Sequence, residues 1–185
     1  MTSQADDPFA GALTHTDRLS LTWQPLAQWP AGPEMAEANR NAIALLGLLG
    51  SLDESPPPIE DIPQLAAHLQ RLDQKLDLVL ELLGSLLARE QVLPTPVPVR
   101  LSARGVAWSA APVPAAGPGW LTLYLLPHLP KALELPARLS PLTGTGEVVA
   151  EFHSLDPALA DALERFVFRR HRRAVALNRR PPTAD

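Results

Sequence analysis

The placement of proline is the feature that most limits where helices can form in this chain. The 185 residues include 21 prolines, and a proline inside a helix removes a backbone hydrogen bond and clashes with the preceding turn. Residues 34–55, 64–93 and 158–180 are free of proline and long enough for a sustained helix. The eleven prolines between the second and third of these windows separate short alternating apolar segments, which is typical of strands joined by turns. We therefore expect helices on both sides of a β-rich region.

The second window carries an unbroken heptad pattern. Apolar residues recur at alternating spacings of three and four, which predicts a coiled-coil seam. The predicted oligomerisation residues are Ile62, Leu65, Leu69, Leu72, Leu76, Val79, Leu83 and Leu86. Pro63 fits only the first turn of such a helix, so the acidic Glu60 and Asp61 mark its start.

Two arrangements could bury this seam. Leu80, Leu82 and Leu87 widen the apolar stripe, and a wide stripe suits a bundle of more than two helices. Alternatively, the first window could fold back through the turn-forming residues 50–58 as an intramolecular helical hairpin. The regular heptad phase and the shortness of the first window favour a homo-oligomer.

Residues 97–153 are predicted to form about five strands. Leu121, Leu123 and Leu125 share one face of a strand, and a small antiparallel barrel would bury that face without leaving exposed edges. Asp156 followed by Pro157 is a strong helix start. An apolar stripe along this last helix is expected to dock on the barrel, and it comprises Leu159, Leu163, Phe166 and Val167.

The sequence lacks the catalytic and ligand-binding motifs of common enzymes. The chain has no cysteine, its histidines lack metal-ligand spacing, and it has neither a nucleophile elbow nor a phosphate loop. We therefore predict no catalytic residue, no metal site and no enzymatic activity. The first twenty residues contain no apolar run, which argues against a signal peptide, and no stretch is long and apolar enough to span a membrane. Together with the absence of cysteine, this leads us to expect a cytoplasmic protein.

Seven arginines fall within residues 165–180. Cations are favoured near a helix C-terminus by the helix dipole, so a solvated or intramolecular role accounts for much of this enrichment. Binding of phosphates on a partner or a cyclic dinucleotide is the other interpretation that stays open. The net charge of −4 argues against nucleic acid as a partner.

The order of several short motifs resembles a PilZ domain. The motifs are residues 99–108, 135–139, 147–152 and 163–170, and the resemblance covers about residues 92–175. PilZ domains are six-stranded barrels with a C-terminal helix, and many are bacterial receptors for cyclic di-GMP. The resemblance thus implies an α+β fold: a small antiparallel six-stranded β-barrel with a C-terminal helix, preceded by a helical hairpin or coiled-coil oligomerisation segment.

PilZ receptors bind the dinucleotide with an RxxxR pair before the barrel and a D/NxSxxG motif on an early strand. Ser102 and Gly105 match the second motif, but Arg100 stands where an acceptor side chain is needed. Arg100 and Arg104 spell RxxxR, yet they overlap the other motif. The resemblance therefore implies no cofactor in the usual mode, with Arg100, Ser102, Arg104 and Gly105 as the only candidate ligand residues. The alternative is a genuine cyclic di-GMP receptor that uses Arg100, Arg104 and the C-terminal arginines.

Residues 16–23 resemble the leader of a divergent PilZ subgroup that assembles as a tetramer through heptad-bearing helices. This resemblance implies a homo-tetramer and divides the chain into a leader at 1–32 with a strand at 18–24, a helical oligomerisation region at 33–93, a barrel with its helix at 94–180, and a tail at 181–185. The function it implies is a non-enzymatic regulatory or adaptor role in cyclic di-GMP signalling or surface motility, exerted on an unidentified protein partner.

Overall fold

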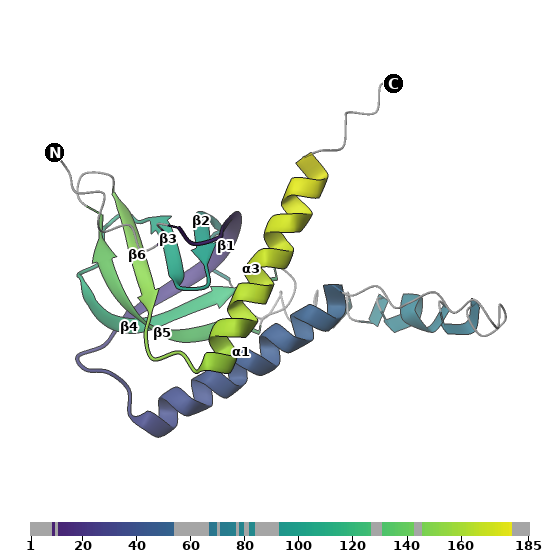
Figure 1. Cartoon of the computed structure of the whole chain (residues 1–185), viewed down its shortest axis with the longest axis horizontal. Helices are drawn as coiled ribbons and strands as arrows, with labels where there is room; N and C mark the ends of the chain where they lie inside the picture. Colours follow the sequence, from purple (N-terminus) through teal and green to yellow (C-terminus); the bar gives the residue numbers. More distant parts are fainter. Residues whose placement is uncertain are drawn as a thin grey trace.

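The computed structural model describes residues 9, 11–53, 67–69, 71–76, 78–79, 82–83, 93–126, 131–142 and 146–178 (Figure 1). The elements, in chain order, are β1 (Thr14–Pro25), α1 (Gly32–Asp53), β2 (Val97–Ser102), β3 (Gly105–Ser109), β4 (Gly117–Tyr124), β5 (Leu133–Pro141), β6 (Glu147–Phe152) and α3 (Pro157–Asn178). The described residues between 67 and 83 are helical as well.

The strands close into an antiparallel barrel with the order β1-β2-β3-β6-β5-β4. The long strand β1 closes it, because its first half pairs with β2 from Thr14 opposite Ser102 and its second half pairs with β4 from Ser20 opposite Tyr124. The predicted six-stranded barrel with a C-terminal helix is therefore confirmed. The strand expected at 18–24 is part of a longer strand that bridges two neighbours.

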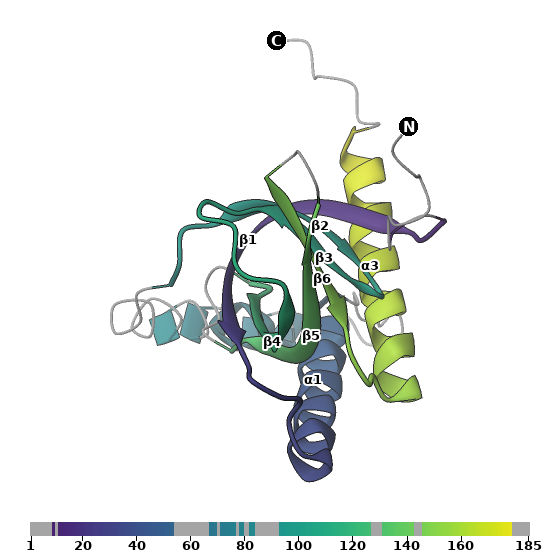
Figure 2. The same ribbon diagram turned by 90° about the vertical axis from the view of Figure 1, so that its left-hand side faces the viewer.

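One apolar core fills the barrel and continues between the barrel and the two helices. Leu121, Leu123 and Leu135 are fully buried inside it. Figure 2 shows α3 standing beside the barrel and α1 crossing below it. Both helices therefore extend the core of the barrel.

The start of α3 follows the sequence prediction. The carboxylate of Asp156 accepts a hydrogen bond from the backbone N–H of Ala158 at 2.8 Å, which caps the first turn. The predicted apolar stripe is buried throughout, with exposures of 0% for Leu159 and Leu163, 2% for Phe166 and 1% for Val167. The docking of this helix is thus encoded by its own periodicity.

Helix α1 packs its apolar face against the barrel domain. Ala42, Leu45, Leu46 and Leu49 are buried, and α1 contacts α3 and β5. The described heptad residues stay exposed, so the intramolecular hairpin alternative is wrong for the part of the seam that the structure describes. The physical reason is that the single apolar stripe of α1 is already covered.

A histidine pair lies where the start of β1 meets α3. The Nδ1 atom of His171 lies 3.2 Å from the backbone oxygen of Thr14, and the Nε2 atom of His15 lies 3.6 Å from a carboxylate oxygen of Asp17. Burial lowers the pKa of His15 below its ordinary value of 6.5, and the nearby Arg170 and His171 act in the same direction against the attraction of Asp17.

We expect acid to weaken the fold partly through His15. Because its pKa is lower in the folded chain, the unfolded chain binds the proton more tightly, so the contribution of His15 is intact above pH 6.5 and declines as the pH falls toward the folded pKa. Urea unfolding at about pH 7.5 and about pH 5.5 should show a smaller loss of unfolding free energy for His15→Gln than for the wild type. The control is His68→Gln at an exposed position, and an unchanged pH dependence in His15→Gln would contradict this assignment.

Candidate functional site

The hydroxyl of Ser102 closes the turn between β2 and β3. Ser102 is completely buried, and its Oγ accepts hydrogen bonds from the backbone N–H groups of Arg104 at 3.0 Å and Gly105 at 3.2 Å. The same hydroxyl lies 3.3 Å from the backbone oxygen of Gly105, to which it donates. The hydrogen-bonding capacity of this side chain is therefore spent within the turn.

Gly105 is required by the packing of β3 against β6. A Cβ atom at this position would overlap the backbone carbonyl oxygen of Ala150, and it would lie 3.2 Å from the Cα of Glu151. The two positions at which the chain matches the D/NxSxxG motif thus have a structural explanation within the turn and the strand pairing.

Arg100 lies on the outer face of the barrel. Its partner across the β2–β3 ladder is Ala107, and its guanidinium carbon lies 4.7 Å from the centre of the Phe9 ring. This distance is typical of a cation–π contact. The leader of the chain therefore engages Arg100 directly.

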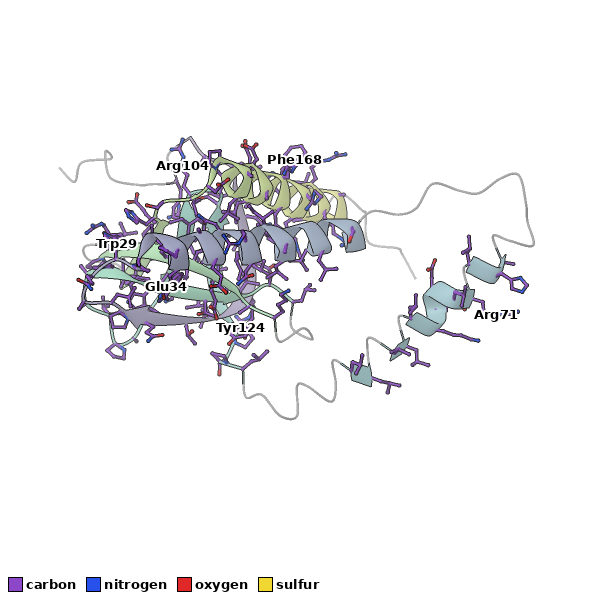
Figure 3. All side chains as sticks on the ribbon, turned by 90° about the horizontal axis from the view of Figure 1, so that it is seen from below. Trp29, Glu34, Arg71, Arg104, Tyr124 and Phe168 are labelled. Atoms are coloured by element: carbon purple, nitrogen blue, oxygen red, sulfur yellow. The ribbon has the colours of Figure 1, made fainter. Side chains whose placement is uncertain are left out.

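Arg104 lies in the β2–β3 turn and lines a different surface. It contributes to a hollow of about 510 Å³ between this turn, β6 and α3, with Glu151, Asp161 and Glu164 among the other lining residues. Figure 3 shows Arg104 beside the first half of α3. Three carboxylates make this hollow unsuitable for a phosphate, because like charges repel. Arg100 and Arg104 do not form the phosphate-binding pair that their spacing suggests.

The C-terminal half of α3 carries a separate cationic surface, which we term the basic hollow. Arg169, Arg170, Arg172, Arg173 and Ala176 line this space of about 430 Å³. The buried Nε atoms of Arg169 and Arg170 have no hydrogen-bond partner in the part of the chain that the structure describes. The basic hollow lies about 14 Å along the helix from the Arg104 surface, at 1.5 Å per residue.

The described residues hold no group of three or more histidine or acidic side chains that could bind a metal ion. No described helix is long and apolar enough to cross a membrane.

The described heptad residues expose their apolar side chains. The exposed fractions are 38% for Leu69, 55% for Leu72, 59% for Leu76, 50% for Val79 and 49% for Leu83. In Figure 1 these helical turns lie beyond the end of α1 and away from the barrel. Ile62, Leu65 and Leu86 lie outside the described residues. Leu78 and Leu82, which lie off the predicted seam, are 56% exposed as well, so the apolar side chains described in this segment are open to solvent in the single chain.

Residues 47–180 match the family of atypical PilZ domains, which is described as a family of cyclic di-GMP receptors. The chain belongs to the atypical PilZ family. The resemblance inferred from the barrel motifs is thereby confirmed, and the match also takes in the heptad region.

A solved structure supports the same assignment over nearly the whole chain. This atypical PilZ protein is similar to a pathogenic protein from Xanthomonas campestris described as a tetrameric PilZ domain self-assembled via an unusual helical bundle. The two share 30% sequence identity with a TM-score of 0.69, over 91% of this chain and 93% of the other. No curated protein matches the sequence.

Sequence reasoning missed one residue of the candidate site, Phe9. The only signal for it was an aromatic residue in a leader that is otherwise mostly small and polar. Its contact with Arg100 joins residues far apart in the sequence, which no local pattern encodes.

Proposed function

We propose that this atypical PilZ protein is a non-enzymatic regulatory adaptor in cyclic di-GMP signalling or surface motility. It assembles with copies of itself, with a tetramer favoured, and acts through contacts with a partner protein. The observation that carries this proposal is the exposed seam: five described heptad residues present between 38% and 59% of their surface in the single chain. The tetrameric assembly of the similar Xanthomonas campestris protein supports it.

The same proposal holds that cyclic di-GMP does not bind in the usual mode. Arg100 stands at the acceptor position of the motif, and a guanidinium has no lone pair to offer a guanine edge. Its position over the Phe9 ring and the use of the Ser102 hydroxyl inside the turn support this view. The retained motif residues then serve the fold of the barrel.

The second candidate is a genuine cyclic di-GMP receptor that uses an arginine surface. The basic hollow favours it, because four arginines surround a space of about 430 Å³ and guanidinium groups bind phosphates strongly. The description of the family as cyclic di-GMP receptors favours it as well.

Calorimetric titration of the full chain with cyclic di-GMP decides between these candidates. We expect no saturable heat at micromolar protein. Saturable binding that is lost in the double variant Arg169→Gln with Arg173→Gln, but kept in Arg40→Gln on the exposed part of α1, would establish the second candidate and overturn the first.

A further inference from the structure

A second apolar cluster lies apart from the main core. It contains Phe9, Ala107 and Val149, with Leu142 packed against it. Phe9 is only 4% exposed although it precedes every regular element of the structure. An aromatic ring from the leader is therefore buried outside the main core of the barrel.

This cluster lies on the outside of the barrel. Along β3, Val106 and Trp108 belong to the main core and Ala107, between them, does not. Successive side chains of a strand point to opposite faces, so Ala107 points outward. Val149 is its partner on β6 and Arg100 its partner on β2, which places all three in one row across the outer surface. We term the surface formed by Arg100, Ala107, Leu142 and Val149 the outer recess.

The Phe9 ring is buried in a cluster with Ala107 and Val149, and Ala107 lies between Arg100 and Val149 across the sheet. Above the ring lies the guanidinium of Arg100, at 4.7 Å. Immediately after Phe9 the chain makes a tight turn, in which the N–H of Ala12 bonds to the Phe9 oxygen at 3.0 Å and Gly11 adopts a φ of 74°. The short turn that leads into β1 thus places the ring in the outer recess.

The contact is of a kind that opens locally. The contacts described for this part of the leader are one buried ring, its cation–π contact and a turn hydrogen bond, whereas α3 is held by a full apolar stripe. Segments with few buried contacts open at a much lower free-energy cost than the whole fold. Once the leader opens, the barrel presents an apolar recess bordered by a cation.

We propose that the outer recess is a docking site for a partner protein segment in which an aromatic side chain follows acidic residues, and that Phe9 is its resident occupant. This inference rests on the proposed adaptor role and names the chemistry of the partner. The apolar floor of Ala107 and Val149 fits a phenyl ring, and Arg100 favours both the ring face and nearby carboxylates. The leader itself has this composition, since Asp6 and Asp7 precede Phe9 in the sequence.

A peptide suits the outer recess better than a nucleobase. Ala107, Leu142 and Val149 have no side-chain hydrogen-bonding group, and a base held there would leave most of its polar edge unpaired. A phenyl ring has no such edge to satisfy.

The test uses a synthetic peptide of residues 2–13 and the full-length Phe9→Ala variant, in which the outer recess has lost its occupant. Methyl NMR of Ala107 and Val149 should show saturable binding at a dissociation constant of about 0.1 mM or tighter, because a short tether supplies an effective concentration of about a millimolar and Phe9 occupies the recess in the wild type. The wild-type chain and a peptide with alanine in place of Phe9 should each bind at least about tenfold more weakly, since one lacks an empty recess and the other lacks the ring.

Phe168→Ala is the matched control. Phe168 also contacts an arginine, Arg172 at 5.8 Å, but it is 49% exposed on α3, so this variant should bind the peptide no better than the wild type. Ala107→Leu in the Phe9→Ala background fills the outer recess from its floor and should abolish binding. Circular dichroism should show that Phe168→Ala and the double variant Phe9→Ala with Ala107→Leu are both folded.

Peptide that fails to saturate Phe9→Ala at several times a dissociation constant of about 0.1 mM, or that binds it no better than the wild type, would overturn the inference. Cyclic di-GMP that shifts the Ala107 and Val149 methyls of Phe9→Ala, when the peptide does not shift them, would assign the outer recess to a base and overturn the inference also. The oligomeric state of the same samples reports on the proposed assembly independently, so failure of one proposal is distinguishable from failure of the other.

Discussion

Replacing Leu76 and Leu83 together with aspartate should convert the assembled protein into monomers at micromolar concentration. Both residues occupy the same heptad position, and a carboxylate placed in a dry seam costs several kcal/mol, on the order of 2–5 at each site. In the single chain the two side chains are 59% and 49% exposed. The substitutions should therefore leave the barrel folded while they remove the assembly, and light scattering coupled to size-exclusion chromatography measures this directly.

Gln74→Asp is the matched control for this experiment. It introduces one such carboxylate on the same described helical turns, but it falls on the side of the heptad farthest from the predicted seam. This variant should keep the wild-type mass. A monomeric wild type, or an assembly that survives both aspartates, would remove the self-association half of the proposed function.

Gly105→Ala should destabilise the barrel by about 2–3 kcal/mol. The added methyl group would overlap the backbone carbonyl of Ala150, and a backbone neighbour cannot rotate away as the end of a side chain can. Strand β6 would have to shift relative to β3, which would disturb their ladder from Gly105 opposite Glu151 to Ser109 opposite Glu147. Chemical unfolding in the absence of any ligand measures the loss.

Gly47→Ala is the control, and the expected effect has the opposite sign. Gly47 lies inside α1, and a Cβ atom added there would meet nothing within 4 Å. Alanine is favoured over glycine in a helix by about 0.5–1 kcal/mol. A ligand-free Gly105→Ala protein as stable as the wild type would contradict the packing explanation for this glycine.

The barrel and its last helix were predictable because their signals are local. Alternation along Leu121, Leu123 and Leu125 identifies the inward face of a strand wherever that strand pairs. The cap at Asp156 and the stripe that begins at Leu159 act within a few residues of each other. The local sequence pattern of each element thus predicts its buried face, whichever elements pack against it.

The candidate site was less predictable, because the motif letters do not specify what their side chains contact. Ser102 and Gly105 matched a ligand motif, yet in the structure they close a turn and admit a neighbouring strand. Arg100 and Arg104 had the spacing of a phosphate-binding pair, yet one lies over Phe9 and the other faces acidic residues of α3. The spacing is the same whether a strand continues or a turn intervenes, and the turn after Ser102 separated the two arginines.

The sequence by itself determined the barrel strands, the first and last helices and their buried faces, since periodicity and capping act over a few residues, while the leucine seam stays a prediction. The tertiary structure alone decided which surface covers which. It placed α1 on α3 and β5, which left the described heptad residues exposed, and it brought Phe9 to Arg100 across the outside of the barrel. These outcomes depend on the closure of the barrel, which sets strands and a leader from distant parts of the chain side by side.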